Sequence, residues 1–589
     1  MAITPSFHSH TSRRDSGTPG TTDGIPEQLG NLCRASGTDT VSGSLYPTHL
    51  FGSLIKDHMQ TASTLRARAS ALHKLSVVLC CCGLLGAHLI LNAQNVVLTG
   101  SLSGQIADPS GAVIPGASVL VRSLATGVEK AATTNHAGLY QFPALMPGAY
   151  SVTASLKGFR DTEILTEVLV GRSAVQDIKL QVGASGDTVK VTGTTPLLRP
   201  GESSTSTVID RSMIDDLPLN GRRYTDLAVL TPNTSYDGDT GLVSVAGQQG
   251  GEDSGYANGN GSNNFTVDGS NATSNYFADI VGRYRIPYLY GEDAIEEFQV
   301  SVSPYSSVYG GGAGFVNAVT RSGSNAFHGS AFYYNRPNAT GANNAINIAN
   351  GFPKPYDSLQ QFGAGIGGPI VKNRLWFFVD YEQQLRNDPI QVINSALQTT
   401  PANLSQFLSD NFGLPPGTVL PPPNGPLPVP GVVTAPDPNN PAYLQQVSNV
   451  VNALNSNLGS KPRQRNDLVF TGRMDYQASP KDVLYLSLNY NDFNSPGGVI
   501  TDPTVGNYGE QTLANAYVHA FLASVGWTHT FSASLLNEFH FGTSQDNQIA
   551  TPTGLAPNTP TIILDSPAAF ILGNAPFSIG SVFERQFSL

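Results

Sequence analysis

The sequence predicts a mainly β protein with three successive folded regions: a small β-sandwich, a mixed α/β domain and a partial antiparallel β-barrel. Three observations support this prediction. Only 13% of the 589 residues are charged, while 61 are Gly and 40 are Pro, a composition that favours strands and turns over helices. Short segments of alternating apolar and polar residues recur between turn residues. Toward the C-terminus, short and long connections between these segments alternate.

Charge and cysteine content exclude several classes of protein. The net charge is -11 and no Lys/Arg block interrupts it, which argues against a nucleic-acid partner because such binding needs a basic surface. The four cysteines are Cys33, Cys80, Cys81 and Cys82. The residues after Cys82 therefore contain neither a disulfide scaffold nor a Cys-ligated metal site.

An export signal is expected inside the N-terminal region. Basic residues within 66–74 precede an apolar run at 75–91, and small residues follow, which is the order found in secretory signals. This predicts a signal peptide at 59–94. A membrane anchor is the alternative, although the run is near the lower length limit for spanning a bilayer. Residues 1–58 are polar and without hydrophobic periodicity, so we expect a disordered or misannotated extension.

Residues 98–182 predict the β-sandwich. Short candidate strands are separated by turns such as Pro115-Gly116 and Pro147-Gly148, a spacing typical of compact sandwiches. The aromatic residues of this region more plausibly fill a small core than form a sugar-binding platform. The candidate strands are 100–108, 117–123, 129–134, 138–142, 148–156, 162–170 and 174–182.

This region resembles the carboxypeptidase regulatory-like domain, a transthyretin-like β-sandwich. The resemblance implies no catalytic residue, and some relatives with this sandwich bind carbohydrate. It is carried by Gly104, Asp108, Gly111, Pro115, Gly116, Ala117, Thr134, Gly138, Leu139, Tyr140, Pro147, Gly148 and Tyr150.

Residues 187–193 follow the sandwich and alternate apolar with polar residues, which predicts an edge strand. The segment resembles the TonB box, whose partner is the TonB-type energising protein that adds to it as a strand through main-chain hydrogen bonds. An ordinary linker strand is an equal alternative. The predicted contact residues are Asp187, Thr188, Val189, Lys190, Val191 and Thr192.

Residues 207–323 predict a mixed α/β domain. A short helix at 210–218 ends before a proline, strands are expected at 264–269 and 294–300, and a Gly-rich strand closes the region at 309–323. A phosphate-binding loop is excluded for that last segment because no Gly-Lys-Ser/Thr follows. These segments, in this order, resemble the plug of TonB-dependent transporters, most closely the Oar-like family.

Residues 326–589 predict an incomplete barrel with two different faces. In 467–477 and 482–492, apolar residues alternate with polar ones, so one face suits lipid and the other a watery lumen. Each candidate strand is long enough to cross a bilayer when tilted. About seven or eight strands are expected, at 327–336, 359–367, 374–385, 467–477, 482–492, 518–530, 535–545 and 579–589.

The connections between these strands fit a bacterial outer-membrane barrel. Short turns at 368–373, 478–481 and 531–534 alternate with long segments at 337–358, 386–466 and 493–517, which we expect to be outer loops. The segments 361–370 and 374–378 again resemble Oar-like transporters, whose barrels have about twenty-two strands around a plug. We therefore expect this chain to form an open half-barrel. We also expect the sequence to be a fragment, or the product of a truncated gene or of one half of a split gene.

The resemblance implies an outer-membrane TonB-dependent transporter of a Gram-negative bacterium, with its N-terminal domain in the periplasm, that binds a ligand outside and imports it with inner-membrane energy. The ligand is left open between carbohydrate, peptide and chelate. A non-transporting binding or adhesion protein and a non-functional fragment are the alternatives. We predict no enzyme, cofactor or metal site, because catalytic motifs are absent. Ligand contacts, or else ordinary turns, are expected at Asn258, Asn260, Asn263, Asn264, Asp268, Asn271 and Asn275.

Overall fold

The computed structural model describes the chain from Leu98 to Ser588 with gaps. The predicted extension at 1–58 and signal peptide at 59–94 lie outside the described residues. The remaining gaps are 184–187, 193–204, 237–242, 246–262, 275–278, 281–285, 303–313, 344, 350–352, 394–400, 425–436, 499–503, 507–512, 533–534, 552–561, 565–569, 573–579 and 589.

The first region is a two-sheet sandwich. One sheet has the order β4-β1-β7, with β8 also paired to β1, and the other has the order β3-β2-β5-β6-β9. Alternate side chains of each strand enter a shared apolar core, which is why residues such as Leu102 and Val119 are fully buried. The strands are β1 (Gly100–Ala107), β2 (Ser118–Ser123), β3 (Glu129–Thr133), β4 (Leu139–Leu145), β5 (Gly148–Ser155), β6 (Asp161–Val168), β7 (Ser173–Val175), β8 (Ile178–Lys179) and β9 (Thr188–Thr192).

The second region is built on a five-stranded sheet of order β10-β17-β18-β13-β14. Helix α2 (Arg211–Asp216) begins at Asp210, whose carboxylate accepts a hydrogen bond from the Met213 amide. Its apolar core is continuous with inward side chains of the following barrel strands. The remaining main elements are β10 (Ser206–Ile209), the 3₁₀ helix η1 (Tyr224–Leu230), β13 (Asn263–Val267), β14 (Ser270–Asn271), η3 (Glu292–Ala294), β17 (Ile295–Ser301) and β18 (Gly314–Thr320).

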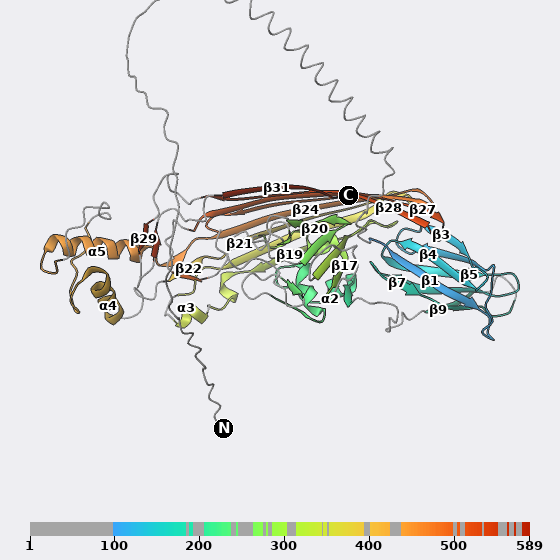
Figure 1. Cartoon of the computed structure of the whole chain (residues 1–589), viewed down its shortest axis with the longest axis horizontal. Helices are drawn as coiled ribbons and strands as arrows, with labels where there is room; N and C mark the ends of the chain where they lie inside the picture. The colour runs from blue at the N-terminus through green and yellow to red at the C-terminus, as the bar shows by residue number, and fades with distance from the viewer. Residues whose placement is uncertain are drawn as a thin grey trace, which may run out of the picture. The chain divides into compact units, whose positions relative to one another are not determined.

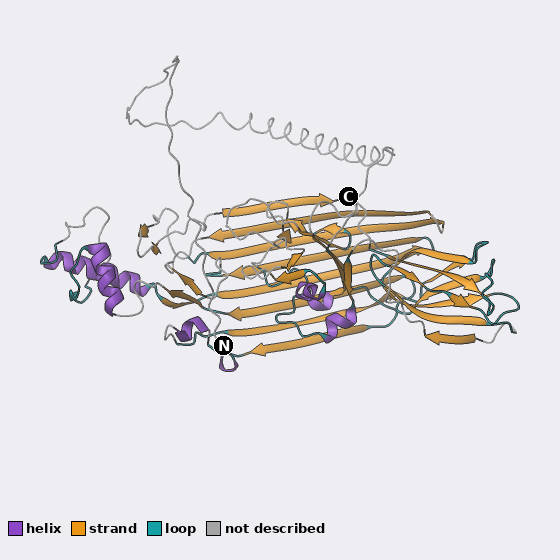
Figure 2. Ribbon diagram, turned by 60° about the horizontal axis from the view of Figure 1, so that its bottom comes forward, coloured by secondary structure: helices purple, strands orange, loops and turns teal. Residues whose placement is uncertain are grey.

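The third region is one eight-stranded antiparallel sheet in which each strand pairs with the next along the path (Figure 2). Within the described residues its first and last strands do not pair with each other, so the sheet is open. The predicted fold class, sandwich, plug and partial barrel, is confirmed. The strands are β19 (His328–Arg336), β20 (Ser358–Val371), β21 (Leu375–Asn387), β24 (Gln464–Ser479), β25 (Asp482–Ser495), β27 (Asn515–Ser532), β28 (Leu535–Thr551) and β31 (Gly580–Ser588).

The two faces of this sheet differ as the alternation predicts. On β24, Phe470 and Met474 are about 40% exposed (41% and 40%), whereas Thr471 and Arg473 are buried. The plug elements β17 and α2 lie against one face of the sheet (Figure 1). On β24 most of the buried side chains are therefore polar, whereas β27 contributes apolar side chains such as Val518 and Leu522 to the core of the plug.

The expectation that 386–466 is only a loop is wrong. It contains β22 (Ile390–Ile393), α4 (Pro401–Phe412), α5 (Pro441–Ser456) and β23 (Gly459–Lys461). The two helices pack on each other around a separate apolar cluster that includes Phe407, Tyr443 and Val451, and this burial stabilises them. The long segment 493–517 likewise contributes a short strand, β26 (Thr504–Gly506), which pairs with β22. None of the described helices is long and apolar enough to span a membrane.

Candidate functional site

The inward face of the sheet contacts the plug through a first charged group, the Arg473 cluster, which comprises Arg473, Asp475, Asp268 and Thr320. The Arg473 guanidinium lies 2.8 Å from an Asp268 oxygen and 3.0 Å from an Asp475 oxygen. The Thr320 amide and hydroxyl also donate to Asp268. Both side chains of the Arg473–Asp268 pair are fully buried, so loss of either partner would leave an uncompensated buried charge between β24 and the plug.

Local backbone geometry places Asp268 at this position. The residue follows β13 and has a positive φ of 47°, and Gly269 continues the turn at 74°. Asn, Asp and Gly tolerate this left-handed conformation better than other residues. The Asp268 carbonyl then accepts hydrogen bonds from the Tyr485 hydroxyl at 2.5 Å and the Ser524 hydroxyl at 2.8 Å. Barrel strands β25 and β27 thus hold the same turn that β24 binds.

A second charged group, the Arg222 cluster, joins the plug to β21. It comprises Arg211, Arg222, Glu292, Asp293, Asp380 and Glu382. Arg222 lies 3.0 Å from Glu382 and 3.3 Å from Asp293, while Arg211 lies 3.2 Å from Asp293. The Arg222 guanidinium also stacks 3.7 Å from the ring centroid of Phe332 on β19.

Burial affects the titration of the plug carboxyl groups. Desolvation is the main cause that raises the pKa of Glu292 above its usual value, and the neighbouring Arg222 opposes this shift. The pKa of Glu297 on β17 is raised to about 8, again mainly by desolvation, although it accepts a hydrogen bond from the Val170 amide.

Neutral hydrogen bonds complete the contact between plug and sheet. Asn489 and Asn491 on β25 donate to the main-chain oxygens of Leu289 and Tyr288, at 3.1 and 3.3 Å. Gln361 on β20 donates to the Tyr288 hydroxyl at 3.1 Å. The plug is thus held to the sheet by hydrogen bonds as well as by ion pairs.

The described residues of the predicted ligand set make hydrogen bonds or ion pairs within the protein. The Asn263 side chain donates to the Val243 carbonyl, Asn264 accepts from Thr273, and Asn271 donates to Gln586 on β31. Asp268 belongs to the Arg473 cluster. These contacts do not test the ligand role, which stays a prediction, and Asn258, Asn260 and Asn275 lie outside the described residues.

The predicted TonB-contact segment is a strand in the structure. Residues Thr188–Thr192 form β9, which pairs in parallel with β6 of the sandwich from Asp161↔Thr188 to Leu165↔Thr192. Asp187 lies outside the described residues. Strand β9 ends the strand order of its sheet, so its second edge has no strand partner among the described residues.

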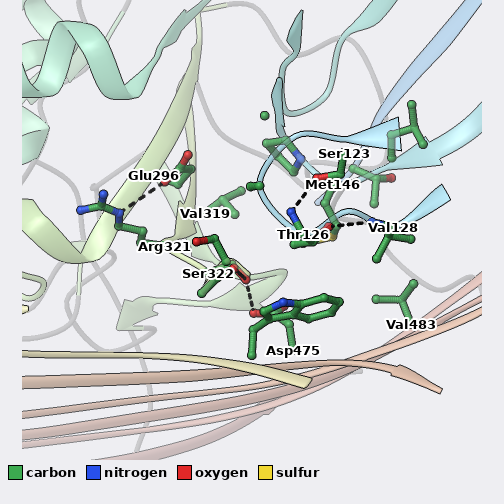
Figure 3. A pocket seen from close by; sticks show the side chains of 18 of the residues that line it. Ser123, Thr126, Val128, Met146, Glu296, Val319, Arg321, Ser322, Asp475 and Val483 are labelled. Atoms are coloured by element: carbon green, nitrogen blue, oxygen red, sulfur yellow. Dashed lines mark hydrogen bonds and ion pairs between the residues drawn. The ribbon is translucent and has the colours of Figure 1, made fainter. Parts of the chain in front are cut away.

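A cavity of about 330 Å³ lies where the sandwich, the plug and the sheet meet. Figure 3 shows Ser123, Thr126 and Met146 of the sandwich across from Arg321 and Ser322, which follow β18. The Ser322 hydroxyl donates to Asp475 at 2.7 Å, so this wall of the cavity is continuous with the Arg473 cluster. The sequence did not indicate the cavity, because its walls come from distant segments.

Comparison with known families agrees with these regions. Residues 101–181 match the carboxypeptidase regulatory-like domain, and residues 319–587 match the outer membrane beta barrel domain. Together with the fold, these matches define an outer-membrane β-barrel protein with an N-terminal regulatory-like sandwich, and they place the chain in the outer membrane.

The chain is also similar to a curated relative, the TonB-dependent transporter Oar of Myxococcus xanthus. The identity is 26% over 283 residues, which are 45% of this chain and 25% of the relative. The predicted resemblance to Oar-like TonB-dependent transporters is thereby confirmed. This chain matches only about a quarter of the length of that relative.

Solved structures with similarity to the chain include the siderophore receptor PirA from Acinetobacter baumannii, at 12% identity and a TM-score of 0.34, covering 65% of this chain and 44% of that one. The outer membrane transporter YddB from Escherichia coli has 9% identity and a TM-score of 0.38, covering 65% and 44%.

Proposed function

We propose that the chain acts in ligand uptake across the outer membrane, with energy supplied by a TonB-type protein in the periplasm. The observation that carries the proposal is the contact between plug and sheet, which consists of ion pairs, hydrogen bonds and a continuous apolar core. Such contacts allow a plug to be held at rest and displaced by force. The regulatory-like sandwich then lies on the periplasmic side, next to the short turns.

The energising protein would bind β9. An edge strand offers free main-chain donors and acceptors, so an added strand needs little side-chain complementarity. Because β9 lies between the sandwich and the plug in the sequence, a pull on it is transmitted along the chain to β10. The sandwich provides a docked position for the segment in the resting state.

Transport is tested by locking the plug. The Ser270 and Ser524 hydroxyl oxygens lie 2.8 Å apart across the interface, and no cysteine follows Cys82 in the sequence. We expect the double variant Ser270→Cys, Ser524→Cys to lose energy-dependent uptake when oxidised and to regain it with dithiothreitol. Probes are a labelled oligosaccharide, a short peptide and a ferric chelate, and each single variant is the control.

The outcome separates transport from its alternatives. Uptake that is unchanged in the oxidised double variant contradicts a mobile plug. Probe that is retained at the cell surface without any uptake, in wild-type cells with a working energising protein, favours a binding or adhesion protein instead.

The role of β9 needs its own experiment. Proline has no amide hydrogen and breaks strand pairing, so Val189→Pro is expected to abolish binding of a purified periplasmic TonB-type domain to the full chain. Val189→Thr keeps the backbone donor and is expected to retain binding. Equal binding by both variants identifies β9 as an ordinary linker strand.

A further inference from the structure

Three carboxylates from two regions of the molecule converge within the Arg222 cluster. Asp293 comes from η3 of the plug, and Asp380 and Glu382 come from β21. One oxygen of each lies within 4.8 Å of one oxygen of the other two, and all three residues are buried. Asp380 and Glu382 are two residues apart on a strand, so both side chains point to the plug side of the sheet.

Asp380 makes no hydrogen bond with any described residue. It is only 1% exposed, and both of its carboxylate oxygens are buried without a hydrogen-bond partner in the part of the chain that the structure describes. A buried ionised carboxylate in this state is strongly unfavourable unless it binds a cation or takes up a proton. The two arginines of the cluster are already engaged, Arg222 by Glu382 and Asp293, and Arg211 by Asp215 and Asp293.

The charge of the whole cluster is unbalanced. Its four carboxylates face two guanidinium groups, which leaves an excess of two negative charges before Asp215 is counted. A divalent cation compensates this excess in one step. In the Arg473 cluster two carboxylates also share one arginine, but all four of their oxygens accept hydrogen bonds from described residues.

The backbone at Gly291 opens the space in which the oxygens meet. A Cβ atom at this position would lie 2.5 Å from a Glu382 oxygen and 2.7 Å from an Asp380 oxygen. Any side chain here would displace one of the two carboxylates. Glycine therefore lets the main chain of the plug approach β21 closely while both oxygens point to the same spot.

We propose that Asp293, Asp380 and Glu382 form a binding site for a hard divalent cation of the calcium class, shared by the plug and the barrel. The donors are all oxygens, which such cations prefer. Calcium–oxygen distances of about 2.3–2.6 Å put opposite ligands roughly 4.6–5.2 Å apart, which accommodates the observed spacing. The Ser330 hydroxyl, which donates to Asp293 at 2.8 Å, supports that carboxylate from β19. The site does not depend on which ligand the protein transports.

The test measures calcium and magnesium binding to the full chain in detergent micelles by isothermal titration calorimetry, after removal of metal with EDTA. We expect one saturable site in the wild type and a loss of affinity of more than about tenfold in Asp380→Asn, since even the loss of an outer-shell partner costs roughly 10–100-fold. Asp546→Asn is the matched control, because Asp546 is a buried carboxylate on β28 outside the cluster, and it is expected to bind as the wild type does.

A second variant guards against misfolding. Gly291→Ala fills the space between the carboxylates without removing any of them, and we expect the same loss of binding with circular dichroism unchanged. Two results overturn the proposal. If the wild-type chain binds neither cation at millimolar concentration, Asp380 carries a proton instead. If calcium binding survives in both variants, the ion binds elsewhere. Neither result bears on uptake, so failure of this site and failure of the transport proposal are distinguishable.

Discussion

The two charged clusters between the plug and the sheet differ in how their charges are matched. In the Arg473 cluster each carboxylate oxygen has a donor, so the plug is fixed without any other component. In the Arg222 cluster, by contrast, neither oxygen of Asp380 accepts a hydrogen bond from any described residue. The difference indicates that the first cluster is a complete structural link, whereas the second needs something added to complete it.

The largest effect is expected from Arg473→Met. The change leaves Asp268 buried without its cation, which costs about 3–5 kcal/mol in comparable buried pairs. Urea unfolding of the full chain in lipid vesicles, followed by protease sensitivity of the plug, measures the loss. Arg374→Met is the control, because Arg374 is exposed in the turn between β20 and β21 and should change stability by less than about 0.5 kcal/mol. Equal results for both variants would remove the distinction between buried and exposed arginines.

Arg222→Met is expected to have a large effect that depends on calcium. Without metal, four carboxylates are left with Arg211 alone, so the plug should be destabilised by roughly the same 3–5 kcal/mol. Calcium at a hundred times its dissociation constant should restore about 2.7 kcal/mol. The same unfolding assay with EDTA and with calcium measures this. Asp380→Asn is the control, because it removes a ligand of the proposed site and should show no stabilisation by calcium.

Replacement of Asp by Asn should change the stability of the folded chain in opposite directions in the two clusters. In EDTA, Asp380→Asn removes an unpaired buried charge and is expected to stabilise the chain by about 1–3 kcal/mol, the usual cost of an unsatisfied buried group. Asp268→Asn removes the charge that pairs with Arg473 and is expected to destabilise it. Thermal unfolding of both variants in parallel gives the two signs. Destabilisation by both would mean that Asp380 is already satisfied.

A separate effect, which depends on pH, is expected from Glu297, a buried carboxyl that belongs to neither cluster. Its pKa in the folded chain is raised to about 8 from an ordinary value of 4.5, mainly by desolvation. The folded state therefore binds the proton more tightly, and this contribution to stability is present below pH 4.5 and is lost as the pH rises through about 8. The slope is at most about 1.4 kcal/mol per pH unit. Glu297→Gln should flatten the stability curve over this window, and an unchanged curve contradicts the assignment.

The strands could be predicted because their signal is local. Alternation along 467–477 and 482–492 located β24 and β25 and also their two faces. Strands β27 and β28 run further toward the long connections than predicted, to Asn515 and Thr551. The added end of β28 begins with three polar residues at 546–548, and backbone pairing with β27 continues there as far as Asn515↔Thr551.

The helices α4 and α5 were missed although one signal was present. In 441–456 the buried residues Tyr443, Val447, Val451 and Leu454 recur at helical spacing, and Asn440 caps the start. The surrounding Pro- and Asn-rich composition concealed this pattern.

The two charged clusters could be predicted only in part. Arg473 and Asp475 on β24, and Asp380 and Glu382 on β21, are charged residues at inward positions, and this much follows from alternation. Their partners do not, because Asp268 and Asp293 come from plug turns far away in the sequence. Local patterns cannot specify contacts of this kind, which arise only when separate segments pack together.

The helical hairpin of α4 and α5 has a consequence for how such proteins diversify. Its apolar cluster is separate from those of the plug and sandwich, and it is inserted beyond the point where Arg386 and Arg465 still pair across β21 and β24. The register of these strands is set by their own ladder and not by the insertion. Recombination could therefore replace this hairpin with another insertion while the strands of the sheet keep their pairing.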